Sequence, residues 1–141
     1  MRYVLDSSVA FEWVVPEPDS DKAIRLREDF RNGLHEVLAP DIFPTEIANA
    51  LLVAERRGRI AAGQFPVLLA DVLTTCPLLV PAIPLLARVA VLVAGIRLSA
   101  YDALYVALAE REGCEFVTAD DRLFRSVQTQ FPFVRALAGF P

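Results

Sequence analysis

Acidic residues stand at the ends of apolar stretches or at helix starts at four widely separated points of this sequence. Asp6 and Asp120 each follow a short apolar stretch, whereas Glu46 and Asp102 fall in the first turn of a predicted helix. Carboxylates brought together from such positions can bind a divalent cation and activate a water molecule. The chemistry to consider first is therefore metal-assisted hydrolysis.

Each position also has a simpler explanation. Helix starts favour carboxylates through capping and the helix dipole, which accounts for Glu46, Asp102 and Asp120 taken one at a time. It accounts poorly for Asp6. Other acids lie beside arginines at helical spacings, as on a solvated helix face, and need no function: Glu28, Asp29, Glu55, Glu110 and Glu112.

Asp6 follows a predicted buried strand, where an unpaired charge is costly to desolvate. Lys22 is the only lysine, and no arginine is adjacent to Asp6 or Glu46 in the sequence. A bound divalent cation is the economical counter-charge for four clustered anions, and oxygen ligands select Mg²⁺ or Mn²⁺. Two isolated cysteines and one histidine argue against a zinc site.

The elements that would position these acids alternate along the chain. Short apolar strands separated by helices indicate an α/β fold with a mostly parallel sheet covered on both faces, and ligands then bind beyond the carboxyl ends of the strands. The predicted strands are 3–5, 37–39, 78–80, 116–118 and 133–136. The predicted helices are 20–30, 44–58, 64–73, 85–94, 99–113 and 121–127.

Length and composition indicate one domain over residues 1–141, with 55% hydrophobic residues. The net charge of −4 argues against nucleic-acid binding by bulk charge, but without the four acids the balance is −4 + 4 = 0. Residues 78–96 are apolar enough to suggest a membrane span. Pro81, Pro84 and Arg88 argue against one, and we expect a cytoplasmic protein without a signal peptide.

Together these motifs resemble the PIN-domain ribonucleases, especially the toxins of VapBC toxin–antitoxin systems. The resemblance extends over essentially the whole chain and rests on VLDSSV, PTEIANAL, SAYDALYVALAE and FVTADDRLF. Asn49 stands where the family has an aspartate.

The resemblance implies a three-layer α/β/α sandwich in which Asp6, Glu46, Asp102 and Asp120 bind one or two Mg²⁺ or Mn²⁺ ions. It also implies an endoribonuclease that hydrolyses RNA phosphodiester bonds. The implied partners are a second copy of the chain, in a homodimer, and a cognate antitoxin that presents a basic side chain to the acids. The alternative is a catalytically silent PIN-fold module for RNA binding or assembly, against which the four intact acids argue.

Several further residues receive accessory roles. Ser8 and Thr118 are expected to orient ligands or waters, unless they make plain backbone hydrogen bonds. Asp121 is either an accessory ligand or the cap of the last short helix, and we favour the cap. Arg122 and Arg125 are the candidate RNA contacts. The cations Arg56, Arg57 and Arg59 are more simply explained as favourable charges at a helix C-terminus.

Two rival families with acids at strand ends fit less well. A phosphoryl-accepting receiver domain requires a lysine at a late strand end, but Lys22 lies on an early predicted helix. A phosphatase of the haloacid dehalogenase type requires a second aspartate where this chain has Ser8. Neither chemistry is expected here.

Overall fold

The computed structural model describes residues 1–141 and contains one five-stranded sheet in which every strand pair is parallel. The strand order is β3-β2-β1-β4-β5. The predicted parallel sheet is confirmed. The strands are β1 (Arg2–Leu5), β2 (Glu36–Pro40), β3 (Leu78–Val80), β4 (Glu115–Thr118) and β5 (Val134–Ala136).

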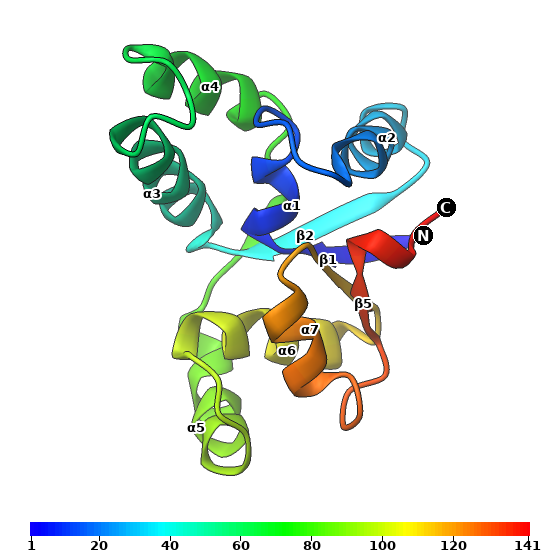
Figure 1. Ribbon diagram of the computed structural model, residues 1–141. Coiled ribbons are helices and arrows are strands. Elements are labelled where there is room, and N and C mark those ends of the chain that lie inside the picture. Colours follow the sequence, from blue (N-terminus) through cyan, green and yellow to red (C-terminus); the bar gives the residue numbers. More distant parts are fainter.

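Helices cover both faces of this sheet, as in the predicted three-layer sandwich. Helices α1 to α4 lie on one face and α5 to α7 on the other (Figure 1). The helices are α1 (Ser7–Phe11), α2 (Ser20–Arg31), α3 (Phe43–Arg56), α4 (Gln64–Leu73), α5 (Leu86–Gly95), α6 (Ala100–Glu112) and α7 (Asp121–Val127). Two 3₁₀ turns, η1 (Ile83–Leu85) and η2 (Leu137–Gly139), complete the elements.

Helix α6 lies at the centre of one helical layer. Its residues 103–109 are all buried, and it packs against β1, β2 and β4. Ser99 caps its start by accepting a hydrogen bond from the Asp102 amide at 3.1 Å, and Gly113 ends it in the left-handed conformation. Both ends were predicted. The helix therefore holds Asp102 in a rigid first turn.

No single helix is long and apolar enough to cross a membrane. The segment Ile83–Gly95 and helix α6 pass together by length and composition, but they meet at 114°.

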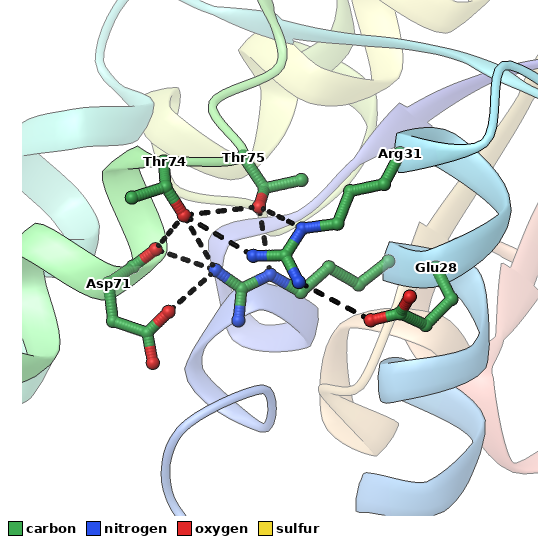
Figure 2. A network of polar contacts seen from close by, with 6 residues as sticks. Glu28, Arg31, Asp71, Thr74 and Thr75 are labelled. Atoms are coloured by element: carbon green, nitrogen blue, oxygen red, sulfur yellow. Dashed lines mark hydrogen bonds and ion pairs between the residues drawn. The ribbon is translucent and has the colours of Figure 1, made fainter.

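A polar network ties α2 to the end of α4 (Figure 2). The buried Arg27 donates from Nε to Thr75 Oγ1 at 3.0 Å and from Nη2 to Asp71 Oδ1 at 2.9 Å. Its guanidinium also lies 4.8 Å from the ring centroid of Trp13. Arg31 joins the same network through Thr75. Because Trp13 lies two residues after the end of α1, this network also supports the helix that carries Ser7 and Ser8.

The strand order indicates where on the sheet a ligand crevice should lie. Strand β1 is central, with β2 on one side and β4 on the other, and the chain crosses to the opposite face between β3 and β4 (Figure 1). Ligand crevices form at such a reversal of strand order. The register pairs Leu5 with Val117. Asp6 therefore emerges beside Thr118.

Candidate active site

A cavity of about 610 Å³ opens at the carboxyl ends of β1 and β4. The four acids singled out in the sequence all line it, although each comes from a different segment of the chain. Asp6 follows β1, Asp120 follows β4, and Glu46 and Asp102 lie in the first turns of α3 and α6. The fold thus brings together residues that are up to 114 positions apart in sequence, from 6 to 120.

Two hydroxyl groups hold the Asp6 carboxylate. Thr118 Oγ1 donates to Asp6 Oδ2 at 2.7 Å, and Ser8 Oγ donates to the same atom at 2.8 Å. Each hydroxyl accepts from the loop after β4 in turn: Thr118 from the Asp120 amide and Ser8 from the Ala119 amide, both at 3.0 Å. The hydroxyls therefore link the two strand ends and fix one oxygen of Asp6. Asp6 Oδ1 makes no hydrogen bond to protein.

Burial raises the pKa of Asp6 to about 7, although the hydrogen bonds from Thr118 and Ser8 act in the opposite direction. The negative charges of Asp102 and Glu46 raise this pKa further. The side chain is only 6% exposed, so desolvation dominates. Without a cation, Asp6 therefore shifts toward the neutral acid near neutral pH.

Glu46 is held by a partner that sequence reasoning did not identify. The Tyr105 hydroxyl donates to Glu46 Oε1 at 2.6 Å, and Ser7 Oγ donates to the same atom at 3.5 Å. Tyr105 is fully buried on α6 and stacks on Phe116 with 5.5 Å between ring centroids. Burial raises the pKa of Glu46, and the hydrogen bond from Tyr105 opposes that shift. The sequence signal for this contact was the position of Tyr105, three residues after Asp102 on the same predicted helix.

Asp120 has a structural role as well as a place in the cavity. Its Oδ1 accepts hydrogen bonds from the amides of Arg122 and Leu123 at 3.0 and 3.1 Å, so Asp120 is the N-cap of α7. Our preference for Asp121 as the cap was wrong, because Asp120 occupies the cap position and Asp121 is the first helical residue. Asp121 is exposed, does not line the cavity, and lies 4.0 Å from Arg125.

Asp102 completes the set. Burial raises the pKa of Asp102, the hydrogen bond with Ser99 lowers it, and the charge of Asp120 raises it. The acids are thus close enough for their charges to repel. Asp6 is repelled by Asp102 and Glu46, and Asp102 is repelled by Asp120.

The donor set suits a hard divalent cation. None of the four carboxylates forms an ion pair with a basic side chain, and in Asp6, Glu46 and Asp120 one oxygen is fixed while the other has no protein partner. Oxygen ligands with some freedom match the way Mg²⁺ combines a few carboxylates with waters. The acids are not drawn into a tight cluster, since no three of them stand in a ready-made metal-binding arrangement.

The arginines around the cavity differ from those singled out in the sequence. Arg57 and Arg59 line it, whereas Arg122 and Arg125 do not. Arg59 forms an ion pair with Glu17 and lies 5.6 Å from the ring centroid of Phe11. Arg57 follows the α3 face that carries Glu46, Ala50 and Val53, all of which line the cavity. Spacings of four, seven and eleven residues from Glu46 were the available signal.

Glu12 is a further acid of the cavity that sequence reasoning missed. Its Oε1 is buried and has no hydrogen-bond partner. Burial raises the pKa of Glu12 to about 7, with contributions from Asp19 and Glu17. Glu12 therefore ionises less readily than an exposed glutamate.

Comparisons with known proteins identify a family and similar folds. Residues 3–129 match the PIN domain family. The structure of PAE2754 from Pyrobaculum aerophilum superposes with a TM-score of 0.68 at 26% identity, covering 98% of this chain and 93% of that one. VapBC2 from Rickettsia felis, solved with a fragment of promoter DNA, gives a TM-score of 0.65 at 14% identity, with 96% and 98% covered. No curated protein matches the sequence significantly.

Proposed function

The chain belongs to the PIN domain family, and from that premise we propose that it is an endoribonuclease dependent on Mg²⁺ or Mn²⁺. One observation carries the proposal: four carboxylates from four segments line one cavity, and no basic side chain pairs with any of them. Burial desolvates Asp6, Glu46 and Asp102, and such acids without counter-charges are costly unless a cation is bound. Structural ion pairs would have given each acid its own arginine.

In this proposal Asp6, Glu46, Asp102 and Asp120 hold the ion. When bound, the ion polarises a phosphoryl oxygen and lowers the pKa of an attacking water. The protein keeps its ligands in place: Ser8 and Thr118 fix Asp6, and Tyr105 fixes Glu46. Arg57 at the cavity wall, which forms no ion pair, provides positive charge for the phosphates that flank the cleaved bond, whereas Arg59 is paired with Glu17.

A cleavage assay on single-stranded RNA tests the function. The wild-type protein should cleave with Mg²⁺ or Mn²⁺ and stop when a chelator is added. Asp6→Asn should lower kcat by at least about 100-fold, because it removes one negatively charged carboxylate from the proposed metal site. Asp121→Asn is the matched control, since Asp121 lies outside the cavity, and it should cleave at nearly the wild-type rate. Equal rates for Asp6→Asn and wild type would contradict the proposal.

A catalytically silent RNA-binding module remains the alternative. The looseness of the acid arrangement favours it, because no three acids are preorganised for an ion. Asn49, at the cavity wall where the family has an aspartate, also favours it. The same assay separates the two readings, since a silent module would retain RNA on a filter without shortening it.

We further propose that the chain is the toxin of a toxin–antitoxin pair and forms a homodimer. The structural similarity to VapBC2 supports the antitoxin. Exposed apolar side chains around the edge strand β3 and α5 support a second copy, because large apolar patches are usually covered by a partner. Among them are Leu78, Ile83, Leu86 and Val91. Co-expression with the product of the adjacent gene, followed by sedimentation analysis, would show both associations; a monomer that ignores that product would contradict them.

A further inference from the structure

A second hollow of about 480 Å³ adjoins the acid cavity. Its walls are Asp41, Ile42, Thr45, Glu46, Asn49 and Tyr101. Glu46 and Asn49 also line the acid cavity, so the two spaces meet along the first two turns of α3. The acid cavity, which Arg57 and Arg59 also line, and the hollow that contains Tyr101 therefore share one wall on α3.

Tyr101 is the only aromatic side chain of the chain that is exposed, with 60% of its surface accessible. It makes no side-chain hydrogen bond and no contact with another ring, whereas the other two tyrosines make both. No structural role accounts for the ring. It directly precedes Asp102 in the capped first turn of α6, so its backbone is fixed next to the acids.

The rest of the hollow carries hydrogen-bonding groups but no positive charge. Asp41 offers a carboxylate, Thr45 a hydroxyl and Asn49 an amide, and no lysine or arginine lines the space. Such a site does not suit a phosphate. It suits a flat ring with amino groups on its edge, since carboxylates accept hydrogen bonds from exocyclic amines and aromatic side chains stack on bases.

Asp41 is itself held in place. It directly follows β2, its amide donates to Val80 O at 2.9 Å, and its Oδ1 accepts from the Ala82 amide at 3.3 Å. One carboxylate oxygen is thus engaged by the chain, and Oδ2 makes no hydrogen bond to protein. Asp41 also ends a strand at the same sheet edge as Asp6, although it contributes to the hollow and not to the acid cavity.

We propose that this hollow binds one nucleobase of the RNA substrate, adjacent to the cleaved phosphate, with the base stacked on Tyr101 and its exocyclic amine bound by Asp41. Cytosine, adenine and guanine carry such an amine, and uracil does not. The inference rests on the proposed ribonuclease function and adds a base-binding subsite to it.

The test combines protein and substrate changes. The probe is a short single-stranded RNA with one cleavage site and cytosine at the flanking position, compared with the same RNA made abasic there, on either side in turn. Tyr101→Ala should lower kcat/KM on intact RNA roughly 5- to 150-fold, the range for losing one stacked base. Tyr101→Phe keeps the ring and should remain within about 3-fold of wild type.

On the abasic RNA that lacks the contacted base, wild type should fall to the level of Tyr101→Ala, and the substitution should cost nothing further. A Tyr101→Ala penalty that persists on both abasic RNAs would overturn the proposal, because the effect would then come from a disturbed acid site. If the variant folds poorly, wild type alone is enough for the test. A wild-type rate that is the same on the intact RNA and on both abasic RNAs would also overturn the proposal.

Asp41→Asn tests the edge contact. Wild type should prefer cytosine over uracil at the flanking position, and Asp41→Asn should reduce that preference several-fold with little change on the uracil RNA. If wild type cleaves no RNA, the proposed function itself fails. If wild type cleaves and Tyr101→Ala leaves the rate unchanged but dissociates a dimer in sedimentation, the hollow is a subunit contact, and only the subsite is refuted.

Discussion

At the scale of single residues, the site depends on hydroxyl groups that orient carboxylates. Asp6 is held by Ser8 and Thr118, and Glu46 by Tyr105 and Ser7. In both acids the hydrogen bonds converge on one oxygen and leave the other without a protein partner. A hydroxyl that donates to a carboxylate also favours its charged form, which is the form that binds a cation. Orientation and charge are thus set by the same contacts.

Tyr105 is the clearest of these positioning residues. Tyr105→Phe removes only the oxygen that donates to Glu46 Oε1 at 2.6 Å. A hydrogen bond to a charged group contributes about 1.5–3 kcal/mol, so we expect kcat to fall about 10-fold or more with KM nearly unchanged. Because that bond lowers the pKa of Glu46, its loss should move the acidic limb of the pH–rate profile to higher pH. Steady-state kinetics across pH measure both effects.

Tyr3→Phe is the matched control for this substitution. Tyr3 is also buried, but its hydroxyl contacts only Met1 Sδ at 3.6 Å, and it lies near the start of β1, whereas Asp6 follows the end of that strand. It should leave the pH–rate profile unchanged. A Tyr105→Phe profile that superposes on that of Tyr3→Phe would show that Tyr105 has a packing role only.

At the scale of elements, the short helix α1 brings Ser7, Ser8 and Glu12 to the cavity and depends on packing from outside the site. Five residues are too few to form a stable helix alone. Trp13, just after α1, lies beneath the Arg27 guanidinium, which in turn binds the C-terminal end of α4. A cation at that end also interacts favourably with the helix dipole.

We therefore expect Arg27→Ala to destabilise the fold by about 2 kcal/mol, because it removes a buried guanidinium that packs on Trp13 and donates hydrogen bonds to Thr75 and to the half-exposed Asp71. Arg31→Ala is the control. Arg31 joins the same network, but its side chain is 41% exposed, so its loss should cost under about 1 kcal/mol. Urea unfolding measures both. Equal costs for the two variants would contradict the ranking.

The elements themselves could be predicted well from the sequence, because apolar strands and capped helices leave local signals. The bounds of α4, β3 and α7 agree with the prediction to the residue. Helix α1 could not be predicted, because five residues after a strand carry no periodicity. The cap of α7 was assigned one residue too late, because Asp120 and Asp121 are chemically identical and only the backbone geometry distinguishes them.

The acids of the cavity were found because strand ends of a parallel sheet converge. Their surroundings were not, since contacts such as Tyr105 with Glu46 depend on how α6 is rotated against α3, which no local pattern encodes. The same holds for Arg57 and Arg59, which line the cavity from just beyond the C-terminal end of α3, whereas Arg122 and Arg125 do not line it. Contact of Arg122 and Arg125 with RNA stays a prediction without support from the cavity.

At the scale of the whole molecule, the acid cavity lowers stability in the absence of metal. In the folded state the pKa of Asp6 is raised from 3.8 to about 7, so between these values the folded protein binds more protons than the unfolded chain. The free energy of unfolding therefore falls as pH rises through this range. Burial raises the pKa of Glu46 and Asp102 in the same direction, so their contributions have the same sign.

The metal-free protein should accordingly be more stable at pH 5 than at pH 8, and Asp6→Asn, which mimics the neutral acid, should be more stable than wild type at pH 8. We expect the difference in unfolding free energy at pH 8 to be on the order of 3 kcal/mol, below the limit set by the full pKa shift of Asp6.

Mg²⁺ should stabilise wild type more at pH 8 than at pH 5, because protons and the ion compete for the same oxygens, and it should stabilise Asp6→Asn far less. Urea unfolding with chelator or with Mg²⁺ at both pH values measures each difference. Wild type that is equally stable at the two pH values, with no response to Mg²⁺, would refute the view that these acids are held together at a cost that a cation relieves.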